Sequence, residues 1–164
     1  MTMRFHDITS CDVNNGEGFR VTLWLAGCTH HCPGCQNPET WDFNGGQPFT
    51  EADRDYLISE LDHPYIQGLT LSGGDPLDSL DDLLPLVKYI RAKLPSKDIW
   101  LYTGYTIEQI KASRLKAILP YVDVIVDGPY IAAQRDVSLA FRGSANQRII
   151  ELSHPQDEKS KNTY

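Results

Sequence analysis

Short apolar runs alternate with helical patterns through most of this chain, and this alternation constrains the fold more than any other feature of the sequence. Five runs have the length of a β-strand and contain few polar residues: 21–26, 68–71, 99–102, 122–126 and 147–150. Runs of this length and composition predict strands. We therefore expect five strands with helices between them.

The segments between these runs carry helix signals. Residues 50–53 have capping-box spacing, which predicts a helix to about residue 61 with an apolar side made of Tyr56, Leu57 and Leu61. A second apolar stripe predicts a helix from about residue 81 to 94, which Pro95 ends. A third helix is expected to open at Thr106 and to carry a further apolar set: Ile107, Ile110, Leu115 and Ile118.

Repeated strand, helix and strand predict parallel strands joined by right-handed crossovers, with ligands at the carboxyl ends of the strands. Five such units are too few for a closed eight-fold barrel, which takes about 250 residues. We therefore predict an α/β fold, an open partial parallel (β/α) barrel or sheet, as one domain over residues 1–152. Residues 153–164 contain no aliphatic side chain and are expected to form a disordered polar tail.

Charge and hydropathy exclude two classes of partner. The 164 residues include 15 Lys and Arg against 22 Asp and Glu, a formal net charge of −7. An acidic chain without a basic run lacks the attraction that drives binding to nucleic-acid phosphates. The longest apolar stretch, 21–26, is far shorter than the roughly 18 residues of a membrane-spanning helix. No secretion signal is visible at the N-terminus, so a cytoplasmic location is expected.

Three of the four cysteines are close together, which points to a metal site. Cys28, Cys32 and Cys35 can place three thiolates around one centre. In a reducing compartment, such a cluster is more typical of a metal or catalytic group than of disulfides. The distant Cys11 is expected to be a small buried residue.

Zinc and an iron–sulfur cluster compete for these thiolates. Structural zinc takes four protein ligands, so it would need one more from His30, His31 or Cys11. A four-iron cluster accepts three cysteines and leaves one iron open for a substrate. The spacing favours the iron–sulfur cluster and leaves zinc as the alternative. If neither histidine is a ligand, both are expected to lie in a solvated loop.

Polar motifs follow four of the predicted strands and are expected to share one rim. The cysteine loop follows the first strand, residues 72–76 the second, 103–105 the third and 127–130 the fourth. Paired glycines leave backbone groups bare, so a small polar ligand can approach Gly73 and Gly74 closely. Alone, such a motif is a turn; beside three cysteines it indicates a ligand site.

These motifs resemble those of the radical S-adenosylmethionine (SAM) enzymes, and more closely those of the activating enzymes of glycyl-radical enzymes. The Cys-x3-Cys-x2-Cys spacing and the Gly-Gly-Asp-Pro sequence at 73–76 carry the likeness. Further motifs within residues 5–150 are similar to those of the family that activates anaerobic ribonucleoside-triphosphate reductase: 15–20, 27–28, 37, 40–41, 99–100, 103–105, 126–128 and 142–144.

The resemblance implies a radical SAM partial barrel with a 4Fe-4S cluster on Cys28, Cys32 and Cys35. SAM would bind the open iron, and an electron from the cluster would cleave it to methionine and a 5′-deoxyadenosyl radical. That radical would take a hydrogen atom from a glycine of the large reductase subunit. The expected partners are therefore that subunit and a reducing electron donor. No acid–base residue is expected, because the cofactor carries the chemistry.

The resemblance also assigns residues to SAM. The backbone at Gly73 and Gly74 would accept from the SAM ammonium group, and Asp75 would add charge where the wider superfamily usually has glutamate. Asp127 matches an acidic rim position that would hold the ligand or a cation.

The adenine contact departs from the superfamily pattern, because Gly34 stands where an aromatic residue is usual. The backbone of Gly34, Cys35 and Gln36 is the first candidate for this contact, and Trp41 is the second. Arg142 is a candidate for the SAM carboxylate or for a loop of the partner. Two other functions stay open: a radical SAM enzyme with another target, such as a different glycyl-radical enzyme, and a zinc-stabilised interaction module without catalysis.

Overall fold

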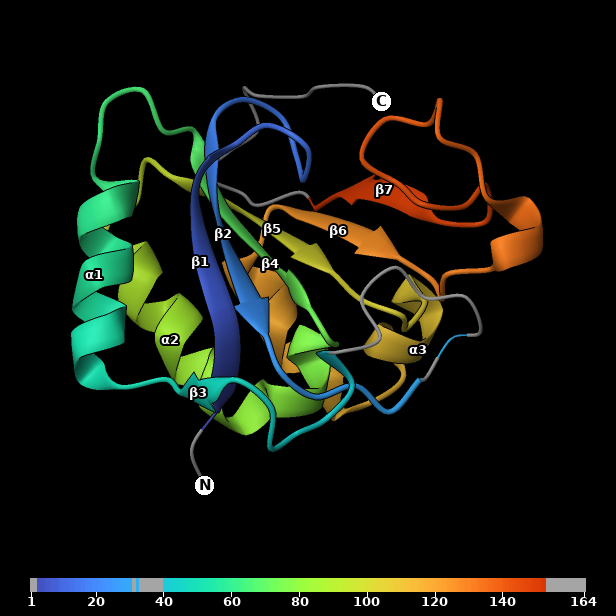
Figure 1. Cartoon of the computed structure of the whole chain (residues 1–164), viewed down its shortest axis with the longest axis horizontal. Helices are drawn as coiled ribbons and strands as arrows, with labels where there is room; N and C mark the ends of the chain where they lie inside the picture. The colour runs from blue at the N-terminus through green and yellow to red at the C-terminus, as the bar shows by residue number, and fades with distance from the viewer. Residues whose placement is uncertain (1–2, 31, 33–39, 153–164) are drawn as a thin grey trace.

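The computed structural model describes residues 3–30, 32 and 40–152, which form a mixed α/β fold around one sheet (Figure 1). The strands are β1 (Arg4–Asp12), β2 (Arg20–Leu25), β3 (Gln47–Pro48), β4 (Gly68–Gly73), β5 (Asp98–Tyr102), β6 (Val124–Asp127) and β7 (Arg148–Glu151). The α-helices are α1 (Glu51–Leu61), α2 (Leu80–Lys93) and α3 (Ile107–Lys111), and the 3-10 helices are η2 (Pro76–Ser79), η3 (Arg114–Tyr121) and η4 (Ala132–Gln134). In the sheet the strands follow the order β3-β1-β2-β4-β5-β6-β7.

Four neighbouring strands in the middle of the sheet, β2, β4, β5 and β6, run parallel. A segment that contains a helix joins each of them to the next, as the alternation in the sequence predicts. The sheet ends at β3 on one side and at β7 on the other, so it is open, in agreement with the prediction. The carboxyl ends of the four parallel strands therefore meet at one end of the sheet.

The fifth predicted strand is present as β7, but it runs antiparallel to β6. A parallel pair needs a crossover that carries the chain back to the far end of the sheet. Residues 128–147 instead contain only the short helix η4 and return at the same end, where Asp127 pairs with Arg148. The prediction of parallel strands is wrong for this last unit.

β1 and β3 carry no strand signal in the sequence. Only Phe5 and Asp12 of β1 are buried, and antiparallel pairing with β2 makes this largely polar segment a strand. The expectation that Cys11 is buried is wrong, because its side chain is exposed. Cys11 has a φ of 56° at an irregularity of the β1–β2 register, and a residue in a bulge leaves the regular alternation of the strand.

Capping boxes mark the starts of α1 and α3, whereas Ser79 before α2 makes no side-chain capping hydrogen bond. Thr50 and Asp53 form the predicted capping box of α1, although Tyr56 is 50% exposed and lies outside the apolar side. α2 is present as predicted. The third predicted helix is broken: α3 ends at Lys111, and the Ser113 hydroxyl accepts the Leu115 N–H to start η3. No helix in the described part of the chain is long and apolar enough to cross a membrane.

Alternate residues of the parallel strands face two different environments. One set packs with the helices in the main core and is apolar throughout: Val21, Leu23, Leu25, Leu69, Leu71, Ile99, Leu101 and Ile125. The intervening residues point to the other face, where β2 and β4 contribute polar side chains and β5 contributes Trp100 and Tyr102. This second face leads toward the carboxyl ends of the strands and contributes to the site described next.

Candidate functional site

A cavity of about 460 Å³ lies at the carboxyl ends of the parallel strands. Each of the four strands contributes residues that follow it directly or closely: Cys28 and Cys32 after β2, Gly73 and Gly74 at the end of β4, Thr103 and Gly104 after β5, and Gly128 after β6. The prediction that the four motifs share one rim is therefore confirmed.

The first two cysteines of the motif lie on the wall of this cavity. Cys28 and Cys32 are both half-buried. A returning segment holds the start of their loop, because Gly27 N donates to Thr40 O at 2.7 Å and Cys28 N donates to Trp41 O at 3.1 Å. Cys35 lies outside the described residues, as do His31, Gly34 and Gln36, so their predicted roles stay predictions.

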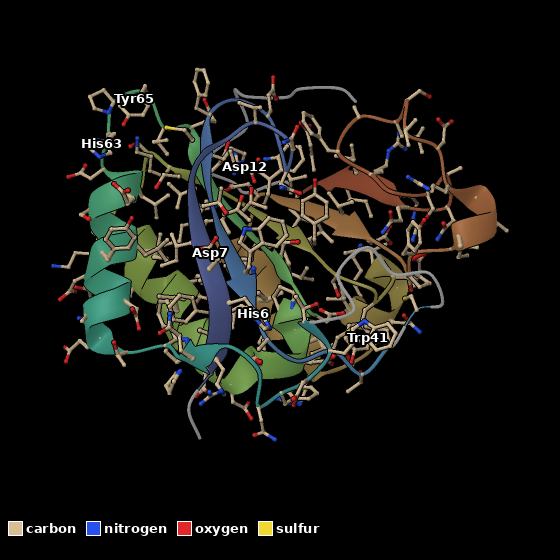
Figure 2. All side chains as sticks on the ribbon, in the orientation of Figure 1. His6, Asp7, Asp12, Trp41, His63 and Tyr65 are labelled. Carbon is tan, nitrogen blue, oxygen red and sulfur yellow. The ribbon has the colours of Figure 1, made fainter. Side chains whose placement is uncertain are left out.

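Cys11 lies at the opposite end of β2 from the cysteine loop. β1 runs antiparallel to β2, and Asp12, which follows Cys11 in the chain, pairs with the first residue of β2. Cys28 comes after the last residue of β2. The Cys11 thiol interacts with the side chain of Tyr65. Figure 2 shows Tyr65 and the cavity residue Trp41 on opposite sides of the molecule. Cys11 therefore cannot join Cys28 around one metal in this fold.

The paired glycines let the end of β4 approach the end of β2 backbone to backbone. Gly74 N donates to Leu25 O at 2.8 Å. A Cβ on Gly73 would lie 2.4 Å from Leu25 O, and one on Gly74 would lie 2.3 Å from Gly27 O. Gly73 also has a φ of +104°, which disfavours any residue with a side chain. Glycine is required at both positions by the fold itself.

Asp75 is buried beneath the rim, and its carboxylate accepts four hydrogen bonds from the protein. The donors are His30 Nε2 at 2.6 Å, Thr103 Oγ1 at 2.9 Å, Gly104 N at 2.9 Å and Leu77 N at 3.0 Å. The expectation that His30 lies in a solvated loop is wrong, since its side chain is only 18% exposed. The sequence gives no signal for this contact, because 45 residues separate the two partners.

Electrostatics at this rim follow from the two carboxylates Asp75 and Asp78. The hydrogen bond to Asp75 raises the pKa of His30 above its ordinary 6.5, in spite of the opposing effect of burial. Burial and the hydrogen bond to Asp78 raise the pKa of Tyr105 to about 12. His30, Asp75 and Asp78 each offer a ligand atom within 4.8 Å of the others, but hydrogen bonds within the protein already engage these groups.

Asp127 and Arg142 occupy different positions relative to the cavity. Asp127 is fully buried and accepts from Ile107 N at 2.8 Å and from Arg148 Nη2 at 2.6 Å, and it is absent from the cavity wall. Arg142 is on the wall, where its guanidinium donates to backbone oxygens of Ala140 and Gln147, both at 3.4 Å.

Several aromatic residues also line the cavity: Trp24, Trp41, Tyr102, Tyr130 and Phe141. The sequence makes Trp41 the second candidate for adenine, and Tyr130 lies in the predicted motif 127–130. The other three carry no motif in the sequence. Trp24 and Tyr102 are on the second face of predicted strands, so strand alternation together with position could have identified them. Phe141 is held in a left-handed conformation with φ 59°, and its carbonyl accepts from Tyr102 Oη at 2.7 Å.

Comparison with known proteins relates this site to an iron–sulfur family. Residues 14–150 match the family described as 4Fe-4S single cluster domain. The chain is also similar to proteins named anaerobic ribonucleoside-triphosphate reductase-activating protein. The one from Escherichia coli K12 is 44% identical over 92% of this chain and 99% of its own length.

Two further relatives carry the same name. The protein from Haemophilus influenzae is 48% identical over 84% of this chain and 91% of its own length. The protein from Enterobacteria phage T4 is 46% identical over 90% of this chain and 93% of its own length. With this identity over most of both chains, the protein belongs to the family of anaerobic ribonucleoside-triphosphate reductase-activating proteins and has a 4Fe-4S single cluster domain.

Proposed function

We propose that this protein activates anaerobic ribonucleoside-triphosphate reductase by generating a glycyl radical on the large reductase subunit. The observation that carries the proposal is that Cys28 and Cys32 share one cavity with Gly73 and Gly74 at the ends of neighbouring parallel strands. The name of the family supports the target, and the 4Fe-4S domain supports the chemistry.

The donor set fits a 4Fe-4S cluster with one open iron. Cys28 and Cys32 face the cavity, and Cys35 would complete a set of three thiolates. Closed zinc sites take four protein ligands. Cys11 lies at the opposite end of β2 and His30 Nε2 is engaged with Asp75, which weighs against zinc. Thiolate ligands also suit the reducing cytoplasm proposed as the location.

When bound, the cluster and SAM would supply the radical chemistry: reductive cleavage of SAM to a 5′-deoxyadenosyl radical that takes a hydrogen atom from a glycine of the reductase. The protein's own part is to bind, to orient and to exclude water. Gly73 and Gly74 are on the cavity wall, and their backbone would accept from the SAM ammonium group.

The remaining proposed SAM contacts differ in how directly they act. Asp75 is committed to four internal donors, so its proposed role is to fix the rim and to add negative charge near the ligand. Asp127 would act in the same indirect way through Ile107 and Arg148. Arg142 is on the cavity wall and remains the candidate for the SAM carboxylate or for a partner loop.

The adenine contact is proposed for the cavity wall near the cysteine loop. The backbone of Gly34, Cys35 and Gln36 remains the first candidate, and the position of Trp41 on the wall supports it as the second. We further propose that the open sheet is a radical SAM partial barrel. Its open side would admit the glycine-bearing segment of the reductase, and an external donor would supply the electron.

The test is an anaerobic assay of SAM cleavage with a matched cysteine control. The protein is reconstituted with iron and sulfide, reduced and mixed with SAM, and 5′-deoxyadenosine is measured for the wild type, Cys32→Ala and Cys11→Ala. We expect product from the wild type and Cys11→Ala and none from Cys32→Ala. Adding the reductase should then give a glycyl-radical signal by electron paramagnetic resonance.

A different result would identify which part of the proposal fails. Colourless protein with about one zinc per chain and no product would refute the enzyme and favour an interaction module. Product without a radical on this reductase would refute the target and favour another glycyl-radical enzyme or a small substrate.

A further inference from the structure

His30 lies in the middle of the segment from Cys28 to Cys32, and its ring is fastened to the neighbouring strand end. Nε2 is 2.6 Å from Asp75 Oδ2. The ring also packs edge-on against Tyr105, with 4.5 Å between the ring centroids and an interplanar angle of 71°. Residues that follow β4 and β5 therefore hold this side chain.

A second attachment lies one residue earlier, at Thr29. Its backbone N–H and its hydroxyl both donate to Asp78 Oδ2, at 2.9 and 3.0 Å. The other carboxylate oxygen of Asp78 accepts from Tyr105 Oη at 2.5 Å. Thr29 and His30 are thus joined to Asp75 and Asp78, which lie at the start of η2 and within it.

The anchor for His30 is itself fixed. Asp75 is 2% exposed and binds Leu77, Thr103 and Gly104 as well as His30. Gly104 also makes room for the imidazole, since a Cβ there would lie 2.6 to 2.9 Å from atoms of the His30 ring. A buried carboxylate with this many donors holds its partners in one geometry.

We propose that His30 is a positioning residue for the cluster loop. Together with Thr29, it holds residues 28–30 against Asp75 and Asp78, which supports Cys28 and Cys32 on the cavity wall before a cluster binds. The inference rests on the proposed function, in which these two cysteines are cluster ligands. A loop ordered in advance loses less conformational entropy when its ligands close around a metal.

The same contacts connect two parts of the site. Asp75 follows the glycine pair directly, and its N–H donates to Gly27 O at 2.8 Å beside Cys28. His30 therefore links the loop of the cluster to the strand end proposed for SAM. Loss of the ring should loosen the loop first and weaken SAM binding as a consequence.

The test compares His30→Ala with the conservative variant His30→Gln and with His63→Ala as a matched control. The glutamine amide can still donate to Asp75, whereas alanine cannot. His63 is a surface histidine whose ring is 3.3 Å from Glu60 at the end of α1, away from the cavity. Thermal unfolding of each variant shows whether it is folded.

The first readout uses protein without metal. Amide hydrogen exchange of residues 28–32 should be about tenfold faster in His30→Ala, because one hydrogen bond to a charged group is lost. His30→Gln should be closer to the wild type, and His63→Ala should match it. Equal exchange in all four proteins would overturn the proposal. This measurement does not depend on radical chemistry, so it separates failure of this inference from failure of the proposed function.

The second readout uses reconstituted protein. Transfer of iron to a chelator should be about tenfold faster for His30→Ala, with rescue by His30→Gln. Iron retention by His30→Ala equal to that of the wild type would contradict a role in holding the loop. If His30→Ala does not fold, Asp78→Ala serves instead, because it removes the acceptor of Thr29 and of Tyr105 Oη, which packs on the His30 ring, and keeps the Asp75 carboxylate. Unchanged exchange and iron retention in that variant would equally overturn the proposal.

Discussion

The guanidinium of Arg20 lies 2.6 Å from the carboxylate of Asp98, which joins the first residue of β2 to the first residue of β5 across the intervening strand β4. Arg20 is fully buried and also donates to Thr70 Oγ1 at 2.7 Å and to Leu69 O at 2.8 Å. Its guanidinium lies 5.3 Å from the centroid of the Trp100 ring. One side chain thus ties together three parallel strands at their amino ends.

Removing this charge should destabilise the fold strongly. Arg20→Met should lower the free energy of unfolding by about 3 kcal/mol, the scale on which breaking a buried ion pair acts. Urea unfolding measures the change. Arg114→Met is the control, because Arg114 and its partner Asp81 are 67% and 83% exposed and such pairs contribute little. If Arg20→Met and Arg114→Met shifted the urea midpoint of unfolding equally, a structural role for Arg20 would be contradicted.

Alanine substitutions at Gly73 and Gly128 distinguish two causes of lost stability, a steric clash of the new Cβ and an unfavourable backbone conformation. Both have positive φ, +104° and +94°, but a Cβ would lie 2.4 Å from the backbone at Gly73 and 3.6 Å from its nearest neighbour at Gly128. Gly128→Ala should therefore cost only the conformational term, about 1–2 kcal/mol. Gly73→Ala should cost clearly more and should also weaken SAM binding, measured by calorimetry on reconstituted protein. A smaller cost at Gly73 would mean that β2 and β4 separate easily.

Asp127→Asn tests whether this carboxylate acts on the rim or on the ligand. Its oxygens accept from Ile107 N and from Arg148, so the variant should lower the free energy of unfolding by about 1–3 kcal/mol. SAM affinity should fall by less than about tenfold, as expected for an indirect effect. Glu108→Gln is the control, since it removes only the exposed partner of Arg148 and should have little effect. A large loss of SAM affinity with normal stability would instead assign Asp127 to the ligand.

Asp12 should make the fold sensitive to acid. Burial acts to raise its pKa, but hydrogen bonds from Asn14, Asn15 and Thr22 and the charge of Arg20 outweigh this, and the pKa falls below its ordinary 3.8. A carboxyl whose pKa is lower in the folded state stabilises the fold above its unfolded pKa, and this stabilisation is lost as the pH falls through the folded value.

The measurement is urea unfolding of the wild type and Asp12→Asn as a function of pH. The wild type should be the more stable at neutral pH, and its advantage should shrink steadily below pH 3.8. Asp136→Asn serves as the comparison, because the pKa of this exposed group is also lowered but its partner is the surface residue Ser138, two positions along the chain. If the wild type and Asp12→Asn differed in free energy of unfolding by the same amount at all pH values, the lowered pKa of Asp12 would be refuted.

The parts of the fold that could be predicted are those with local causes. Apolar runs identify β2, β4, β5 and β6 because these strands are covered on both faces, so that nearly all of their residues are buried. The Thr50 capping box defines the start of α1 because both of its hydrogen bonds lie within four residues. The shared rim follows from parallel topology alone, which explains why four motifs distant in sequence meet at one cavity.

The parts that could not be predicted depend on partners distant in sequence. β1 is a strand because β2 lies beside it, and the direction of β7 depends on how residues 128–147 return. The ring of His30 is half-buried because Asp75, Gly104 and Tyr105 surround it, and no pattern within residues 28–35 encodes them.

Residues 128–147, which connect β6 to the antiparallel strand β7, form a wall of the cavity whose sequence can vary independently of the rest of the site. Residues 128–147 leave and re-enter the sheet at adjacent positions, and Asp127 and Arg148 are bonded to each other where they do so. Tyr130, Phe141 and Arg142 belong to this excursion, whereas the cysteines and the glycine pair do not. Insertions, deletions or grafted sequences within it can therefore reshape what enters the cavity without moving the residues proposed for the cluster.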